Sequence, residues 1–511
     1  MLRMHRVLFS SGLLVSSVGA LACGMSAGCG SSGSEGKGAA PSSDSTTQTG
    51  QNTGGSGGSA GAGGSAGSGG AAGSAGSGDS GALHIAWDLT GIVGTGQSLS
   101  VGAQAGTPTA NAMTQPFHNL KLSLGTLSVP PLDEAASQSD QLSLVPLVEP
   151  IRPVDPGYPS AYPGNLDGES PHTAMSVQLT SMAMADGASD FVTVHTVVGE
   201  SGQGMSVIDK SATVSPNGPN SARAYAATLF EARAIKRLAE AQDKTYGIGA
   251  IFLTHGETDA GNAGYEDAML KLYNDYNADL KAITGQEQSI PLFTSQQHGI
   301  YMYTLGTTAA SNINTSTKLQ WQASLDHPNE IVCVGPKYQY PYFDDYLHLV
   351  AEGYELMGEK YAQAYYERVV LGHEWKPLQP LASTIARSGR NITVDFFVPK
   401  PPLAWDDALP KPHQSDLTEW KEGRGFEVRS SDRTPLTIES VTLVDADTVQ
   451  ITLTADVPPG AILGYAATNG NDAVKNFSPR IGNLRDSDPF VGALTKKPQA
   501  NYAVAFELPV P

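Results

Sequence analysis

The sequence contains only three cysteines, and two of them, Cys23 and Cys29, lie near the amino terminus. A protein with so few cysteines has no disulfide framework. The third, Cys333, lies inside the apolar segment "EIVCVG". We expect it to be buried and unreactive, as a solitary cysteine in an apolar strand usually is.

Basic residues are also few, with 31 Lys and Arg against 50 Asp and Glu. Non-specific binding to nucleic acid or to anionic membranes requires basic patches, so the composition argues against both. The sequence has no H-E-x-x-H, C-x-x-C or P-loop pattern, and His118, His195 and His298 show no metal-like spacing. We therefore expect no metal and no nucleotide cofactor, and interpret these histidines as structural or pocket-lining.

Residues 1–29 have the pattern of an export signal, with two arginines before an apolar stretch from Val7 to Ala22. This stretch of about 16 residues is shorter than the ~20 that span a bilayer. "ALAC" resembles a bacterial lipobox with Cys23 as the lipidated residue, and "SAGC" makes Cys29 a second candidate. The alternative is a simple secretory signal. We predict an exported protein, either an outer-membrane or cell-surface lipoprotein or a secreted one.

Residues 30–82 consist almost entirely of Gly, Ser, Ala and Thr. Such a segment has nothing to bury in a core and is expected to be a flexible linker. Its root-mean-square reach is roughly 40 Å. After a lipid anchor, this linker would hold a globular body clear of a membrane.

Short apolar segments typical of strands buried on both faces of a parallel sheet recur along the next part of the chain. They begin at Leu83, Phe191, Ile248, Ile290 and Glu330. Amphipathic helices are predicted from Ser221, Tyr265 and Ala351. The alternation predicts a three-layer α/β/α sandwich with a parallel, flavodoxin-like sheet over residues 83–376.

The pattern changes in residues 377–511, where short alternating strands follow one another without helices. Apolar residues alternate at Ile392, Val394 and Phe396, and again at Val449, Ile451 and Leu453. This alternation predicts a carboxy-terminal antiparallel β-sandwich domain. Its role is open between a spacing or stabilising domain and a glycan-binding one.

Four segments carry the residues of a candidate site. "GTGQSLS" contains Ser98, "GESGQGMS" and "THGETD" each follow a predicted strand, and "DYLH" places Asp345 three residues before His348. Ligands gather at the carboxyl ends of parallel strands. A serine hydroxyl needs an imidazole to accept its proton and a carboxylate to orient that imidazole, and Ser98, His348 and Asp345 could supply all three groups.

The order of these segments resembles that of the SGNH (GDSL-type) hydrolases over roughly Leu83–Val370. "GQSLS" stands where that family has its GDSL-like block, and "HGETD" is similar to the "QGESD" of the sialate O-acetylesterase-like carbohydrate esterases. The resemblance implies a serine esterase that acts on O-acetyl groups of carbohydrate. It names Ser98 as nucleophile, His348 as general base and Asp345 as its partner.

The resemblance also implies an oxyanion hole, with the Ser98 N–H as first donor and Gly204, or nearby Gly202, as second. The third block departs from the family pattern. Thr258 stands where the standard block has asparagine, and His255 replaces the glutamine. The third donor therefore stays open between His255, Thr258 and a backbone group, while Asp259 is expected to brace the loop by hydrogen bonds.

Two other functions remain open at this point. The same catalytic groups could serve an esterase for lipids or aliphatic polyesters, or the protein could be a non-catalytic carbohydrate-binding lipoprotein. The segments "QPFHNLKLSLG", "LVPLVEP" and "NLDGESPHTA" are expected to be insertions that form part of the pocket wall. No residue in them is assigned to the substrate.

Overall fold

The computed structural model describes residues 83–105, 117–123, 142–151, 168–212, 223–298, 313–343, 345, 347–467 and 482–511. Gly78–Pro511 form one compact unit. The predicted export signal (1–29), with Cys23 and Cys29, and the predicted linker (30–82) lie outside the described residues. Within the described ranges, no helix has the length and apolarity that crossing a membrane requires.

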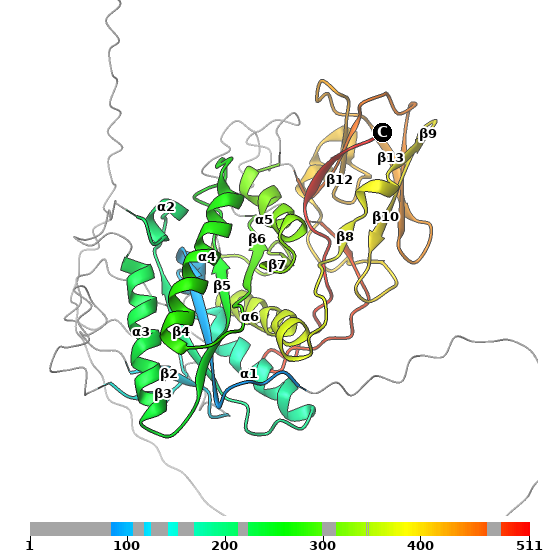
Figure 1. The fold of residues 1–511 in the computed structure, drawn as a ribbon. Coiled ribbons are helices and arrows are strands. Elements are labelled where there is room, and N and C mark those ends of the chain that lie inside the picture. The colour runs from blue at the N-terminus through cyan, green and yellow to red at the C-terminus, as the bar shows by residue number, and fades with distance from the viewer. Residues whose placement is uncertain are drawn as a thin grey trace, which may run out of the picture. The chain divides into compact units, whose positions relative to one another are not determined.

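A seven-stranded sheet in the order β3-β2-β4-β1-β5-β6-β7 forms the centre of the first part of the fold (Figure 1). Neighbouring strands pair in parallel, except that β3 pairs antiparallel with β2 at one edge. The strands are β1 (Leu89–Gly96), β2 (Leu120–Leu122), β3 (Leu144–Pro146), β4 (Thr193–Gly199), β5 (Tyr246–Thr254), β6 (Leu292–Gln296) and β7 (Ile331–Pro336). The predicted parallel sheet is confirmed, with one antiparallel edge strand added.

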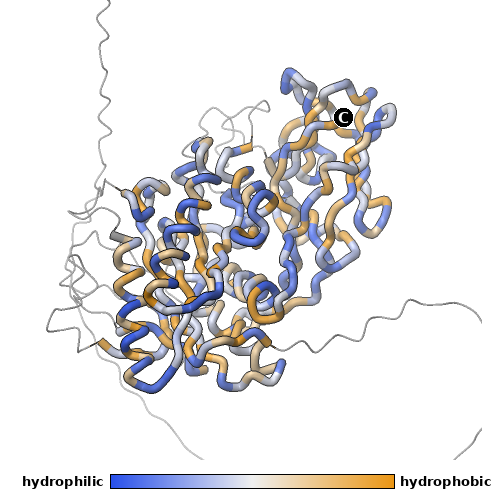
Figure 2. The backbone as a smooth tube through the Cα atoms, viewed as in Figure 1, coloured by the Kyte–Doolittle hydropathy of each residue, from blue (hydrophilic) through white to orange (hydrophobic). Residues whose placement is uncertain are grey.

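Helices cover both faces of this sheet. They are α1 (Pro171–Ala185), α2 (Met205–Ile208), α3 (Arg223–Glu240), α4 (Tyr265–Thr284), α5 (Thr315–Asp326) and α6 (Ala351–Tyr365). Ile92 of β1 packs in one cluster with Met175 of α1 and Tyr361 of α6. Its neighbour Val93 packs in another cluster with Tyr225 of α3. Because successive strand residues face opposite sides, the two clusters define a three-layer sandwich. Figure 2 shows the hydropathy of each residue along these strands and helices.

Strand β1 begins at Leu89 instead of at Leu83, where the apolar pattern placed the first strand. It runs on through the glycines of "GIVGTG", which ordinarily weaken a strand. A Cβ at Gly94 would lie 2.1 Å from Nε2 of His172 on α1. The glycine therefore lets the helix approach the strand closely, and this contact cannot be inferred from the local sequence.

The segments that we expected to form part of a pocket wall also supply elements of the fold, and their place in a pocket wall stays a prediction. They supply β2, β3 and the first turn of α1, so they belong to the sheet and to a layer that covers it. Helix α1 is buried at every residue from Pro171 to Thr180. A helix buried on most sides has no polar face, which removes the amphipathic signal by which a helix is recognised.

The region after α6 is built of antiparallel strands, as predicted. One sheet has the order β13-β14-β10-β8, with β9 paired to β10, another has the order β12-β15-β17, and β11 pairs with β16. The strands are β8 (Gln379–Pro380), β9 (Ala386–Ser388), β10 (Asn391–Phe397), β11 (Ala404–Trp405), β12 (Phe426–Arg429), β13 (Ile438–Leu443), β14 (Thr448–Leu453), β15 (Ile462–Tyr465), β16 (Leu484–Arg485) and β17 (Phe506–Pro509).

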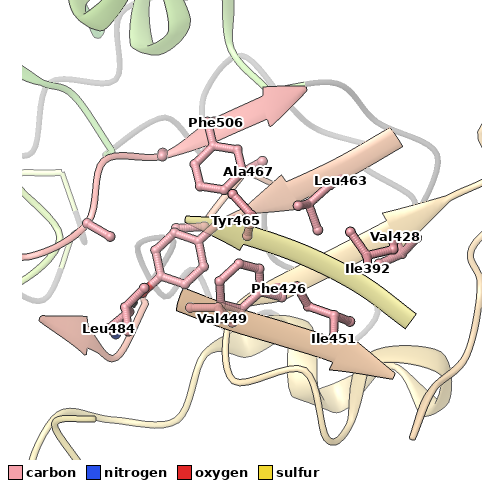
Figure 3. Packing of buried hydrophobic residues seen from close by; sticks show 14 of the residues in the cluster. Ile392, Phe426, Val428, Val449, Ile451, Leu463, Tyr465, Ala467, Leu484 and Phe506 are labelled. Carbon is pink, nitrogen blue, oxygen red and sulfur yellow. Dashed lines mark hydrogen bonds between the residues drawn. The ribbon is translucent and has the colours of Figure 1, made fainter. Parts of the chain in front are cut away.

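Apolar side chains from these sheets form a single cluster (Figure 3). Ile392 and Ile451 enter it from one sheet, and Val428, Leu463 and Phe506 from another. The predicted inward-facing residues are all buried, namely Ile392, Val394, Phe396, Val449, Ile451 and Leu453. The expected alternation of buried and outward residues is therefore confirmed.

Cys333 on β7 is buried, as expected. Burial raises the pKa of its thiol to about 12, so the thiolate needed for reactivity does not form near neutral pH. Cys333 packs in the cluster of the antiparallel region.

Side chains of the α/β layers pack directly against the antiparallel region. Trp321 of α5 belongs to the cluster of that region, and its Nε1 donates to Gln379 Oε1 over 2.8 Å. Gln296, at the end of β6, accepts from the Ala505 N–H over 2.8 Å and donates to the Ala505 carbonyl over 2.9 Å. The predicted domain boundary after residue 376 stays a prediction about independent folding.

Glu359 on α6 makes a further contact of this kind. Its Oε1 accepts from the backbone N–H groups of Leu494 and Thr495 over 2.7 and 2.8 Å. Its Oε2 accepts from the Thr495 hydroxyl and from Gln499 Nε2, both over 2.6 Å. The hydrogen bonds that stabilise this carboxylate therefore come from the segment that contains Leu494, Thr495 and Gln499.

We predict that a chain covering residues 83–376 does not fold alone. Its Trp321 would be exposed, Gln296 would lose both hydrogen bonds to Ala505, and Glu359 would lose its four donors. The measurement is size-exclusion chromatography with thermal unfolding followed by circular dichroism. The control, residues 83–511, should be soluble and unfold in one transition. A soluble, cooperatively unfolding 83–376 fragment would contradict the prediction.

Candidate active site

Strand β1 is an interior strand of the sheet. Ser98 lies just beyond its carboxyl end, as the first residue of a 3-10 turn (Ser98–Ser100). Gly96 has a φ of +137°, and a Cβ there would lie 2.1 Å from the Thr254 carbonyl oxygen. The Gln97 N–H donates to this oxygen over 3.2 Å. The main chain therefore turns sharply against β5. As the first residue of its turn, Ser98 has a backbone N–H that the turn itself does not use.

The structure brings His348 and Asp345 to Ser98. Nε2 of His348 lies 2.8 Å from Ser98 Oγ, and Nδ1 lies 2.6 Å from Asp345 Oδ2. Asp345 Oδ1 accepts from the backbone N–H groups of Leu347 and His348, each over 2.9 Å. The carboxylate thus orients the imidazole, and the imidazole is placed to accept the hydroxyl proton.

The protonation of Asp345 follows from opposing effects. Partial burial raises the pKa of its carboxyl group. Hydrogen bonds from the His348 ring and from the backbone N–H groups of His348 and Leu347 outweigh burial and bring the pKa below its ordinary value. Asp345 therefore stays ionised well below neutral pH, as a partner for an imidazolium must.

The loop that carries Asp345 and His348 is held at its base by backbone contacts. Tyr342 and Leu349 form an antiparallel bridge, and the Phe343 N–H donates to the His348 carbonyl over 2.8 Å. Helix α6 begins at Ala351, directly after this bridge. The loop with Asp345 and His348 is therefore anchored to a buried helix.

Gly204 precedes the short helix α2 at its amino end. The Met205 N–H donates to Asp259 Oδ2 over 2.7 Å, and a Cβ on Gly204 would lie 3.2 Å from both carboxylate oxygens. The expectation that Asp259 braces the loop is confirmed by this bond. The assignment of Gly204, or of Gly202, as second oxyanion donor stays a prediction.

His255 does not suit the role of oxyanion donor that was left open for it. The ring is fully buried, with Nε2 2.9 Å from the Gln203 carbonyl oxygen and Nδ1 3.0 Å from the Tyr265 hydroxyl. Burial lowers the pKa of His255, so the ring is neutral and its one N–H faces the carbonyl. His255 instead ties together the two loops that follow β4 and β5.

Thr258 remains a candidate third donor. Its backbone N–H donates to Gln97 Oε1 over 3.3 Å, which links the "HGETD" loop (His255–Asp259) to the residue before Ser98. The Gly256 carbonyl accepts from Ser316 Oγ over 2.7 Å, so α5 supports the same loop. Gln97 is buried. Its contact with Thr258 was not predicted.

Lys337 is a second residue that sequence reasoning missed. It follows β7 directly, and its Nζ contacts Glu257 Oε1 in an ion pair in which both side chains are almost fully buried. The sequence signal that could have pointed to Lys337 is a single lysine directly after an apolar strand. Such a position lies at the carboxyl edge of a parallel sheet, where functional groups gather.

The other histidines are structural where their side chains are buried. His195 Nδ1 lies 2.9 Å from His172 Nδ1 in the core, and burial lowers the pKa of His172 to about 3. His298 Nδ1 lies 3.1 Å from the Gln296 carbonyl oxygen. His118 is exposed. Across the described ranges, no three His, Cys, Asp or Glu side chains are grouped as metal ligands would be.

Comparisons with known proteins find similarity of structure only. No protein-family model matches the sequence, and no curated protein sequence matches it. A carbohydrate acetylesterase from Xanthomonas citri is 11% identical, with 82% of this chain and 80% of that chain covered and a TM-score of 0.48.

Two further structures cover less of the chain. A carbohydrate acetylesterase from Sinorhizobium meliloti is 13% identical, with 54% of this chain and 97% of that chain covered and a TM-score of 0.27. The aryl esterase of M. smegmatis is 10% identical, with the same coverage and a TM-score of 0.27. At these identities the similarity does not assign the chain to a family.

We predict that Gly96→Ala lowers the free energy of unfolding by about 3 kcal/mol or more, because both the positive φ and the contact with Thr254 resist a side chain. Gly202→Ala is the matched control. Its φ is also positive, at +69°, but no atom lies within 4 Å of the added Cβ. The expected loss there is about 1–2 kcal/mol. Urea unfolding measures both, and equal losses would contradict the prediction.

Proposed function

We propose that this protein is an exported serine esterase that removes O-acetyl groups from carbohydrate through an acyl-enzyme intermediate. The observation that carries the proposal is the continuous hydrogen-bonded arrangement of Ser98, His348 and Asp345 at the carboxyl edge of the sheet. A serine within 2.8 Å of an imidazole that is itself oriented by a carboxylate is the arrangement required of an activated nucleophile.

In the proposed reaction, Ser98 Oγ attacks the ester carbonyl carbon and its proton passes to His348 Nε2. The negative charge on the carbonyl oxygen is stabilised by the N–H groups of Ser98 and Gly204, with the Thr258 hydroxyl as third donor. His348 then returns the proton to the leaving alcohol oxygen, which leaves the acyl group on Ser98. Water attacks this ester with the same base, acetate leaves, and the proton returns to Oγ.

The acetylated carbohydrate is proposed from the resemblance of "HGETD" to the third block of the sialate O-acetylesterase-like carbohydrate esterases. The position of the enzyme is proposed from the amino-terminal pattern, with release as a secreted protein or attachment through lipidated Cys23 or Cys29.

We predict that residues 83–511 hydrolyse p-nitrophenyl acetate and that Ser98→Ala lowers kcat by about 10⁶-fold, the loss known for serine hydrolase nucleophiles. Ser100→Ala is the matched control. Its hydroxyl donates to the Gln97 carbonyl over 2.7 Å, whereas His348 Nε2 lies against Ser98 Oγ, so activity should largely remain. Full activity in Ser98→Ala would contradict the proposal.

The same assay with butyrate and octanoate esters tests the substrate class. An acetylesterase should lose activity with longer acyl chains, because a pocket fitted to a methyl group excludes them. A preference for octanoate would indicate lipids or aliphatic polyesters instead. Glycan binding without turnover of activated esters or acetylated polysaccharide would indicate a non-catalytic carbohydrate-binding protein.

We predict that kcat/KM falls toward acid pH with the slope of a single proton. Protonated His348 cannot accept the proton of Ser98. Asp345 contributes no second step, because its pKa is lowered and the carboxyl is already ionised over this range. The measurement is kcat/KM between about pH 5 and 8. A flat profile would contradict the role of His348.

A further inference from the structure

Glu257 and Lys337 form a buried ion pair beside the catalytic loops. Their side chains are 3% and 1% exposed, and Lys337 Nζ contacts Glu257 Oε1. Among the described residues, Glu257 Oε2 is buried without a hydrogen-bond partner, so the lysine is what compensates this carboxylate. The desolvation cost of a buried ion pair can exceed the attraction between its charges, so stability alone does not account for this pair.

Glu257 is connected to Ser98 through the neighbouring Thr258 and through Gln97. Glu257 lies between Gly256, whose carbonyl is bound by Ser316, and Thr258, whose N–H donates to Gln97 Oε1 over 3.3 Å. Gln97 immediately precedes Ser98. A shift of Glu257 would therefore move the contact that supports the nucleophile's turn.

Lys337 is connected to the loop that carries His348 through Tyr342. The Lys337 carbonyl accepts from the Tyr340 N–H over 3.2 Å and from the Tyr342 hydroxyl over 3.3 Å. Tyr342 forms the bridge with Leu349 that closes the base of the loop carrying His348. The Lys337 N–H is in turn fixed by the Gln296 carbonyl over 3.1 Å. Lys337 therefore supports the loop of the catalytic base.

We infer that the Glu257–Lys337 ion pair is a positioning device that sets the distance between Ser98 and His348 by joining the loops that follow β5 and β7. Neither residue is assigned a contact with substrate. The inference rests on the proposed function, because it concerns the same nucleophile and base. Small displacements of reacting groups can cost about 10²-fold in rate, so a device of this kind has a measurable effect.

The test measures the rate at which a fluorophosphonate labels Ser98 in residues 83–511, well below the unfolding temperature of each variant. The variants are Glu257→Gln, Lys337→Met and the double variant. Removal of one charge leaves the other buried and uncompensated, whereas removal of both relieves that penalty. The double variant should therefore recover thermal stability yet label about 10- to 100-fold more slowly than the unmodified chain.

A buried pair in the antiparallel region provides the matched control. Arg429 Nη2 lies 2.7 Å from Glu427 Oε2, and both side chains are 0% exposed. Glu427→Gln should lower thermal stability but leave the labelling rate unchanged. A purely structural role for Glu257 and Lys337 would give the same result at their positions.

Kinetics on p-nitrophenyl acetate supply a second readout, with a fall in kcat and little change in KM expected for the double variant. Lys337→Arg keeps the charge and should fold even where uncharged variants do not. Its labelling rate should lie between those of the unmodified chain and the double variant. Labelling of the double variant at the unmodified rate would overturn the inference alone. Failure of the unmodified chain to label at Ser98 would overturn both the proposed function and the inference.

Discussion

The close packing around β1 is the constraint on which the rest of the structure depends. Its glycines leave no space for side chains, since a Cβ at Gly94 would meet His172 and one at Gly96 would meet the Thr254 carbonyl. Helix α1 and strand β5 can therefore lie directly against it. Because β1 pairs with β4 on one side and β5 on the other, Ser98 emerges where the loops of three adjacent strands converge.

Hydrogen bonds between the loops stabilise this convergence. Asp259 binds the Met205 N–H, His255 contacts the Gln203 carbonyl, and Gln97 binds the Thr258 N–H. These bonds hold polar groups in places that are largely shielded from water, where an unmatched partner is costly. A site built in this way is held in shape before any substrate arrives, which is what preorganised catalysis requires.

The antiparallel region takes part in the same support. Ala505 binds the side chain of Gln296, and the Gln296 carbonyl in turn accepts from the Lys337 N–H. Glu359 and Lys360 of α6 are bound by the segment that runs from Leu494 to Asn501. Helix α6 begins just after His348. The carboxy-terminal strands thus brace the elements that hold His348.

Local patterns in the sequence were sufficient for the two fold classes, for five of the seven described strands of the parallel sheet and for the grouping of Ser98, His348 and Asp345. Asp345 and His348 lie within one turn, and strand ends of a parallel sheet share an edge, so their meeting with Ser98 could be predicted. Only the tertiary structure decided where β1 starts and how deeply α1 is buried. The same holds for the hydrogen bonds of His255 and for the pairing of Glu257 with Lys337. The last pair is 80 residues apart in the chain. Such contacts depend on which elements pack together, and neither periodicity nor spacing encodes that packing.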